Sequence, residues 1–294
     1  MLKRSFANFF YCLVAICFLS ACNSKKTLSG EAYTLKMQLK EGDKFNHDMD
    51  VMVGTDMSMA GQNISMNMDM NMGVSFDVLS DSAGYKRLKL TYDRVKTTID
   101  FKGLPEGTMD TDAINNAGSK TEGKSIILVL GKGNEIVDVT GFDEMVNDEN
   151  ATLQEREQYK KMFSKEQVNS MMGLMFMMYP DKPVKVGETW DKITEVTMAG
   201  IKMKMNNKFK LLSVNNGVAV IDINSEYKGK GKMEQGGMGL EMDMDGEQSG
   251  KMSIRLKDGY LDNADYKIAI DAEAKIMGQK VPYKVTGRTK MKGK

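Results

Sequence analysis

Cysteine is nearly absent from this sequence, and the three residues that occur all lie within its first 22 positions. They are Cys12, Cys17 and Cys22. Because no thiol follows position 22, disulfides, thiolate metal sites and cysteine nucleophiles are excluded from the rest of the chain. Its function must therefore rest on other side chains.

Histidine is scarcer still, since His47 is the single imidazole of the chain. A Ser-His-Asp triad needs a histidine that faces a nucleophile, whereas His47 occupies the apolar face of a predicted strand, so we interpret it as a packing residue. The glycines at 131, 133, 229 and 231 indicate turns at strand ends and predict no phosphate-binding loop. A paired-carboxylate site stays open, although no Asp or Glu pair stands out. We expect no enzymatic activity, no metal and no cofactor.

Long apolar runs are also missing, and the one candidate lies at the N-terminus. A basic start over residues 1–4 precedes an apolar run over residues 9–19, which is short of the ~20 residues that a transmembrane helix needs. The small residues Ser20 and Ala21 follow it. This order is typical of a secretion signal peptide, here residues 1–21.

The four residues at the end of this segment resemble the lipobox of bacterial lipoproteins; they read Leu19-Ser20-Ala21-Cys22. The resemblance implies cleavage before Cys22, a diacylglycerol thioether on its sulfur and acylation of its new amine. Three acyl chains, at about 0.8 kcal/mol per buried methylene, make a stable anchor. Residues 22–29 are then the lipid anchor and tether, and the membrane is a partner through Cys22.

Net charge of either sign is lacking as well. Loss of Lys3 and Arg4 with the signal peptide lowers the 41 basic side chains to 39, against 40 acidic ones. A neutral chain gains no electrostatic attraction to nucleic acid or to an anionic membrane surface. We therefore predict no nucleic-acid partner and no electrostatic binding to a membrane surface beyond the anchor at Cys22.

Methionine is abundant, with 28 residues. Over residues 45–59 and 64–78, apolar residues, many of them methionine, alternate with polar ones. Period two predicts strands with one buried face, and Gly61 between them predicts a hairpin turn. The same device recurs at Gly200 and Gly278.

An internal repeat relates the two halves of the chain, and repeats decide architecture. The matching features, first half before second, are residues 40–45 and 185–190, Gly61 and Gly200, Phe76 and Phe209, and Gly84 and Gly217. We predict two related β units, residues 30–141 and 183–294.

Between the two units the alternation gives way to a helical pattern. Thr152 indicates one helix start, Ser164 begins a pattern that resembles a capping box, and Pro180 ends the segment. One face of the second helix carries Val168, Met171, Met172, Met175 and Met178. We predict a helical, methionine-rich connection over residues 142–182.

The lipobox, the paired Gly-Asp/Glu strand starts, the methionine-rich helix and the junction at residues 180–190 resemble an uncharacterised family of Bacteroidota lipoproteins, a domain of unknown function. Because that family has no assigned activity, the resemblance implies a compartment and not a mechanism. In that phylum, lipoproteins exported to the surface usually carry acidic residues after the anchor, whereas residues 23–26 here are Asn-Ser-Lys-Lys. The resemblance therefore implies lipid anchoring in the cell envelope, in the outer membrane and facing the periplasm.

Long strands with one apolar face must pack against a second surface, since an open face of that size would aggregate. We therefore expect a mainly β (α+β) fold of two curved antiparallel β units joined by the helical connection. The leading hypothesis is a non-enzymatic lipoprotein that binds an apolar ligand, a lipid or a segment of an envelope protein on an adaptable methionine-lined β surface. The candidate ligand-binding residues are Met66, Met68, Met70, Met72, Met171, Met175, Met203 and Met205.

Two alternatives stay open. Thioethers are soft ligands that suit Cu(I), and Met-x-Met spacing on a strand places both sulfurs on one side, as at Met203 and Met205. A periplasmic Cu(I)-binding protein is therefore the second hypothesis. The third is a structural module whose methionine face is closed core.

Replacing Cys22 by Ser should abolish acylation, because serine offers no sulfur for the thioether. Intact mass and membrane fractionation of the two proteins measure this. An acylated, membrane-bound Cys22→Ser variant would contradict the predicted anchor.

Overall fold

The computed structural model describes residues 30–59, 61–103, 120–141, 164–198, 201–235, 238–276 and 279–294. Several predicted features lie outside these ranges: the signal peptide and tether with Cys22, the helix start at Thr152, and the turn glycines Gly200 and Gly278. The described residues are mostly β-strand.

The first half contains five long or medium strands: β2 (Lys44–Met59), β3 (Gln62–Ser82), β4 (Tyr85–Lys102), β5 (Ser125–Leu130) and β6 (Ile136–Thr140). The second half contains β8 (Thr189–Met198), β9 (Ile201–Asn215), β10 (Val218–Gln235), β11 (Met238–Arg255), β12 (Leu261–Ile276) and β13 (Gln279–Gly293). Helix α5 (Lys165–Met177) occupies part of the predicted connection. Two short strands, β1 (Ala32–Tyr33) and β7 (Val184–Lys185), pair with each other.

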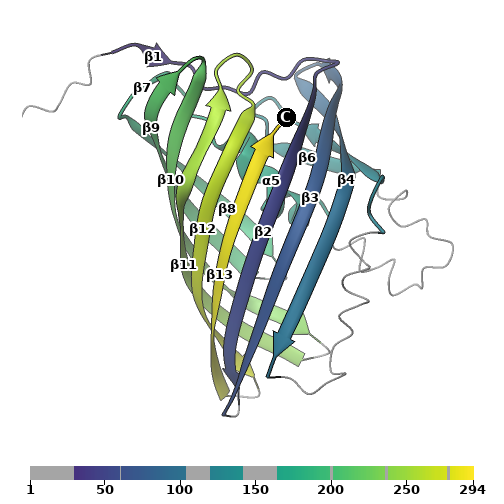
Figure 1. Ribbon diagram of the computed structural model, residues 1–294, viewed down its shortest axis with the longest axis vertical. Helices are drawn as coiled ribbons and strands as arrows, with labels where there is room; N and C mark the ends of the chain where they lie inside the picture. The colour runs from purple at the N-terminus through teal and green to yellow at the C-terminus, as the bar shows by residue number, and fades with distance from the viewer. Residues whose placement is uncertain are drawn as a thin grey trace, which may run out of the picture.

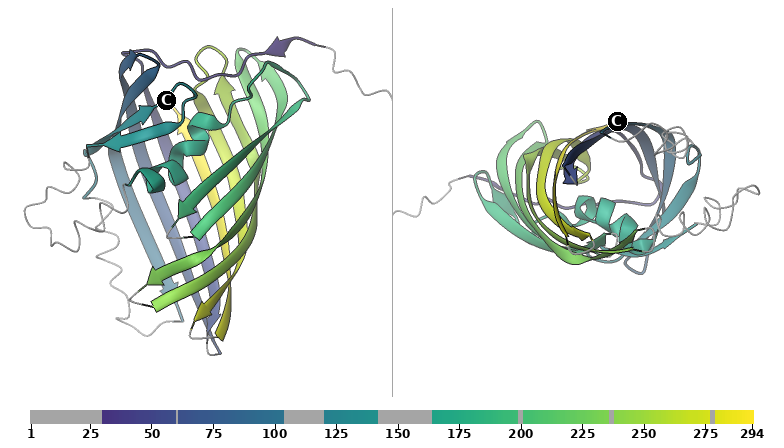
Figure 2. Two further views of the ribbon diagram at one scale, coloured as in Figure 1. Left: turned by 180° about the vertical axis from the view of Figure 1, so that it is seen from behind. Right: turned by 90° about the horizontal axis from the view of Figure 1, so that it is seen from below.

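The eleven larger strands form one antiparallel sheet in the order β6-β5-β4-β3-β2-β13-β12-β11-β10-β9-β8 (Figure 1). The sheet is strongly curved, and its two edge strands approach each other from opposite sides of α5 (Figure 2). The helix contacts both β6 and β8. It therefore covers the opening between two edges whose backbone groups would otherwise be exposed to new pairing partners.

The two predicted β units share a single sheet, because β13 pairs with β2. Eleven residues of β13, starting at Tyr283, pair with the β2 residues from Met57 back to His47. Joining the halves satisfies the backbone N–H and C=O groups that two separate edges would leave unpaired. The two units are halves of one sheet, and their boundaries at residues 141 and 183 stay predictions.

The repeat predicted from the sequence has matching local geometry at its first turn. Gly42 and Gly187 both have positive φ, 87° and 91°, which glycine tolerates best. Gly42 N–H donates to Val78 O at 2.9 Å, and Gly187 N–H donates to Leu211 O at 2.7 Å. In both turns the following acidic side chain accepts a hydrogen bond from the backbone N–H three residues earlier, at 2.8 Å.

The match extends along the following strands. Phe76 pairs with Phe45 across β3 and β2, and Phe209 pairs with Trp190 across β9 and β8. The first aromatic pair stacks at 4.9 Å and the second at 5.4 Å between ring centroids. A β-bulge then displaces Leu79 in one ladder and Leu212 in the other. Phe76 and Phe209 therefore occupy matching places in their strand pairs.

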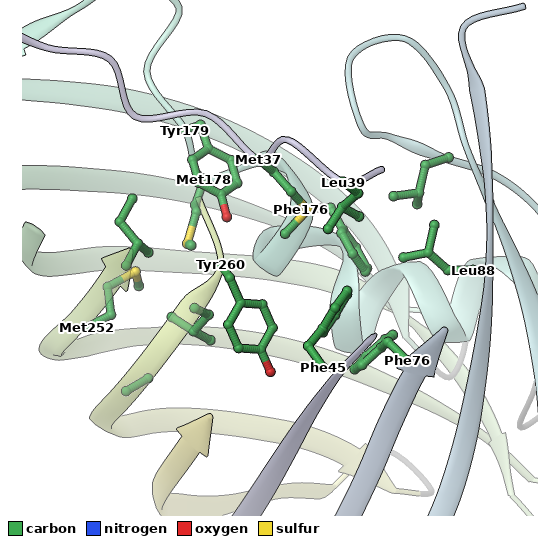
Figure 3. Close-up of a cluster of buried hydrophobic side chains, with 14 of the residues drawn as sticks. Met37, Leu39, Phe45, Phe76, Leu88, Phe176, Met178, Tyr179, Met252 and Tyr260 are labelled. Carbon is green, nitrogen blue, oxygen red and sulfur yellow. The ribbon is translucent and has the colours of Figure 1, made fainter. Parts of the chain in front are cut away.

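The upper end of the sheet encloses the main hydrophobic core (Figure 3). Alternate residues of the segment before β2, namely Leu35, Met37 and Leu39, are buried there. Phe176 of α5 meets Phe76 edge-on with 6.4 Å between ring centroids. Burying each such side chain contributes about 1.5–3 kcal/mol, so this end holds α5 and the N-terminal segment on the sheet.

His47 belongs to this core, as its interpretation as a packing residue requires; it is 1% exposed. Its Nε2 lies 2.8 Å from Leu261 O, and its Nδ1 lies 3.1 Å from the Tyr260 hydroxyl. Burial lowers the pKa of His47, although the hydrogen bond to Leu261 acts in the opposite direction. The ring is therefore neutral in the folded protein near pH 7.

Replacing Gly250 by Ala should destabilise the protein by about 2–3 kcal/mol, because an added methyl would meet backbone that cannot move. A Cβ on Gly250 would lie 2.3 Å from Asp265 O and 2.5 Å from Tyr266 Cα. Gly73 is the control, since a Cβ there meets nothing closer than 3.7 Å. Urea unfolding of both variants measures the difference, and equal midpoints would contradict the close approach of β11 and β12.

The free energy of unfolding should decrease as the pH is lowered through about 6.5, the ordinary histidine pKa. Over this range the unfolded chain gains a proton at His47 and the folded protein does not. The folded pKa is depressed, so the loss continues until that lower pKa is reached. Urea unfolding between about pH 7.5 and about pH 5 measures it. His47→Gln should flatten the profile in this window, and an unchanged slope would show that His47 is not the titrating group.

Candidate functional site

The two faces of the sheet have opposite chemistry. On the outward face, acidic and basic side chains pair across strands: Lys230 lies 2.7 Å from Asp243, and Arg288 donates two hydrogen bonds to Asp265 at 2.9 and 2.7 Å. The Arg288 guanidinium holds the pKa of Asp265 below its usual range. Exposed pairs of this kind add little to stability because solvent screens them, so their main effect is to make this face a water-facing surface.

The inward face is apolar, and its burial changes along the strands. Near α5 it is closed core, whereas further down the strands the inward side chains keep part of their surface exposed. We call this part the lower inward face. Its half-buried members include Val51, Val53, Thr55, Met66, Met68, Met70, Thr97, Ile99, Phe101, Ile268, Ile270 and Val285. These side chains form an apolar surface that the described residues leave incompletely packed.

The eight methionines predicted as one site do not form one patch. Met72 is buried in the main core, and Met175 of α5 packs against that core. Met66, Met68 and Met70 lie on the lower inward face of β3. Of the four candidate methionines on β3, Met72 alone belongs to the main core that α5 closes. The side chain of Met171 lies outside the described part of the chain.

Met203 and Met205 lie across the curved sheet from β3, in a second cluster that sequence reasoning did not foresee as a unit. Its buried members are Ile201, Met203, Met205, Tyr227, Met242 and Ala274, with Met244, Ile268 and Tyr283 packed against them. Gly229 explains the packing, because the space a Cβ would fill is taken by Met244 and Met203, at 2.8 and 3.0 Å. Gly229 and Gly231, interpreted from the sequence as turn residues at strand ends, instead lie within β10 and face inward between methionine-bearing strands. They were the available sequence signal for this cluster.

A buried polar row crosses this same side of the sheet between the two hydrophobic clusters. Asn207, Ser225 and Gln248 pair in register on β9, β10 and β11 and are 1%, 3% and 7% exposed. Ser225 Oγ donates to Asn207 Oδ1 at 2.7 Å. The Asn207 amide donates to Lys192 O at 3.1 Å and to Thr194 Oγ1 at 3.3 Å.

The row ends at Gln248, whose Oε1 accepts a hydrogen bond from the Tyr227 hydroxyl. Burial raises the pKa of Tyr227, so the phenol keeps its proton and remains the donor of this bond. Sequence reasoning missed the row, although Asn207 interrupts the apolar alternation between Met205 and Phe209. That interruption was the available signal.

A hollow of about 440 Å³ opens between the two edges of the sheet, beside the end of α5. Phe176, Tyr179, Lys192 and Thr194 are among its lining residues. Lys192 is neutralised there by Asp181, with 2.6 Å between Nζ and Oδ1. The hollow thus reaches β8, the strand next to the Asn207 end of the polar row.

Within the described ranges, no three His, Cys, Asp or Glu side chains lie close enough together to hold a metal ion. The second cluster gathers soft thioether ligands from Met203, Met205, Met242 and Met244. No described helix combines the length and apolar character needed to cross a membrane.

Among solved structures, the chain is similar to one described as lipid–protein interactions in lipovitellin, with a TM-score of 0.52 and 9% identity. The match covers 87% of this chain and 25% of that chain, so this chain spans about a quarter of it. At this identity the likeness shows the fold alone.

Two further matches have TM-scores too low to carry an argument. The β domain of the Bordetella autotransporter BrkA matches at 0.24 with 8% identity, covering 84% of this chain and 98% of that one. An outer membrane channel from Pseudomonas putida F1 matches at 0.21 with 5% identity, covering 88% and 97%. No curated protein sequence matches this chain.

A family of unknown function, DUF6263, matches residues 53–261. This range includes strands from both halves of the sheet, helix α5 and the polar row. The match agrees with the predicted resemblance to a family without an assigned activity, while the phylum and the lipid anchor stay predictions. Because it covers well over half of the sequence, the chain belongs to the DUF6263 family.

Proposed function

We propose that this protein binds a lipid on the lower inward face of its sheet, without catalysing a reaction, as a lipid-anchored protein of the cell envelope. The observation that carries the proposal is the inverted polarity of the sheet. Its outward face is charged, whereas its inward face is apolar and incompletely packed at residues such as Val53 and Met68. A concave apolar surface of this kind is what a hydrocarbon ligand requires.

The side chains of this face suit a ligand of variable shape. Met66, Met68 and Met70 follow one another on β3, and thioether side chains adapt to irregular apolar partners. Valine, isoleucine and phenylalanine complete the surface without adding a charge. A flexible acyl chain fits such a surface better than a rigid polar ligand.

The likeness in fold to lipovitellin gives independent support, because that structure is described as one of lipid–protein interactions. In this protein α5 and the main core close one end of the curved sheet (Figure 2). The lower inward face lies beyond that closed end, where a bound lipid would replace missing packing.

The proposed location rests on the sequence of the first 26 residues. A secretion signal followed by Leu19-Ser20-Ala21-Cys22 supports a lipid anchor in the cell envelope, and the basic residues after it support the periplasmic side of the outer membrane. The enclosed position of His47 supports a role other than catalysis. A nearby membrane would supply lipid to the open face.

Cu(I) binding is the second candidate, and the second cluster is the observation that favours it. Met203, Met205 and Met242 are buried there and Met244 packs against them, which gathers thioether ligands for a soft metal. The same packing also fills a hydrophobic core, and Tyr283 donates a hydrogen bond to the sulfur of Met242 at 3.6 Å.

Native mass spectrometry of the full chain, extracted from membranes in mild detergent, should detect a retained lipid. Met68→Gln places an amide among the apolar side chains of the lower inward face, so it should weaken lipid binding by about 1–2 kcal/mol, or about five- to thirtyfold. Met52→Gln is the matched control, because Met52 is 42% exposed and faces outward, so that variant should retain lipid like the wild type.

The same spectra separate the alternatives. Retained copper without lipid would favour the Cu(I) site, and a retained peptide would favour a protein segment as ligand. Wild-type protein with no adduct would favour the purely structural reading. Equal losses in Met68→Gln and Met52→Gln would contradict binding on the inward face.

A further inference from the structure

The polar row is one half of a longer row of paired residues that crosses the inward face of the sheet. Paired positions run from Lys192 on β8 through Asn207, Ser225 and Gln248. The same row continues through Ile268, Gly287, Val53, Met68 and Ile99 on β12, β13, β2, β3 and β4. One half of the row is therefore polar and buried, and the other half is apolar and half-buried.

Gln248 stands at the boundary between these halves with unused hydrogen-bonding capacity. Its Oε1 accepts from Tyr227, whereas its Nε2 amide makes no hydrogen bond to any described residue. A donor that is 7% exposed has little access to water, and buried donors in native proteins nearly always have an acceptor. The unpaired amide points to an acceptor that a ligand supplies.

The other polar side chains next to Gln248 in the row, Asn207 and Ser225, already have hydrogen-bond partners. Both amide hydrogens of Asn207 are donated, and its carbonyl accepts from Ser225. They hold the polar half in place, so the group left to contact a ligand is the Gln248 amide. This amide can donate a hydrogen bond to an uncharged acceptor such as a carbonyl oxygen.

The charges along the register row also favour an uncharged ligand group. Lys192 is the one ionisable side chain in this register row, and it is paired with Asp181. An anion placed beside Gln248 would lose its hydration without gaining a cation, which is strongly unfavourable in a buried site. A neutral ester loses far less.

We propose, on the basis of the lipid-binding function above, that the ligand is a neutral ester lipid whose carbonyl oxygen accepts a hydrogen bond from the Gln248 amide. Its acyl chain lies along the apolar half of the row, over Ile268, Val53 and Met68. Strands are spaced about 4.8 Å apart, so the four steps from β11 to β3 span about 19 Å of curved surface, enough for a long acyl chain.

The test measures binding of methyl oleate and of octadecene, probes that differ in the ester group, to the full chain. One hydrogen bond corresponds to about a fivefold difference in affinity. Gln248→Met keeps the length of the side chain and removes its amide, so it should lower the ratio of methyl oleate affinity to octadecene affinity about fivefold. Binding of octadecene should be unchanged, which also reports that the variant is folded.

Tyr227→Phe is the matched control, because it removes the hydroxyl that contacts Gln248 and leaves the amide donors in place. It should keep the preference for the ester. If both probes bind and the ratio is the same in wild type and Gln248→Met, the assignment of Gln248 is overturned while lipid binding stands. If neither probe binds the wild type, the proposed function fails together with it.

Two further measurements use the wild type and so do not depend on a variant. The infrared carbonyl band of bound methyl oleate, labelled with carbon-13 at the ester, should shift to the lower frequency of a hydrogen-bonded ester. A band at the position found in hydrocarbon solvent would overturn the proposal. Tighter binding of the oleate anion than of methyl oleate would overturn the choice of a neutral group.

Discussion

The ladder between β13 and β2 is the interaction on which the rest of this structure depends. It joins the last strand of the chain to the first long strand, and it makes one inward face out of two halves. Without it, the register row that runs from Lys192 to Ile99 would be broken in the middle. Its hydrogen bonds are backbone bonds, so the chain pays the loop-closure entropy of a contact between distant segments.

The curvature of that single sheet produces both the core and the candidate site. At one end α5 and the N-terminal segment fill the inward face, where Phe76 contacts both Phe45 and Phe176 (Figure 3). Further along the strands the same alternation continues, and none of the described elements forms a second layer over it. The inward side chains there remain apolar but lose partners, and this is why the site is a continuation of the core rather than a separate structure.

Methionine and glycine act together on this face. Gly229 gives up its side-chain volume to Met203 and Met244, and Gly250 lets the backbone of Tyr266 approach closely. Small residues thus permit the bend, while flexible thioethers fill the irregular space that the bend creates. The polar row at Asn207, Ser225 and Gln248 interrupts this pattern and separates the two hydrophobic clusters. The apolar surface therefore has a polar boundary on one side.

The sequence by itself determined the strands, their inward faces, the hairpin turns and the local repeat, because alternation, glycine at positive φ and paired aromatic residues act over short distances. It indicated Met66, Met68 and Met70 as inward-facing for the same reason. It did not determine that the halves share one sheet, nor that Met72 and Met203 belong to different clusters. Those outcomes, and the meeting of Gln248 with Ser225 and Ile268, depend on strand order and register. Only the tertiary structure decides these, because any two edge strands offer the same backbone groups and the choice between them is made by the packing of the whole sheet.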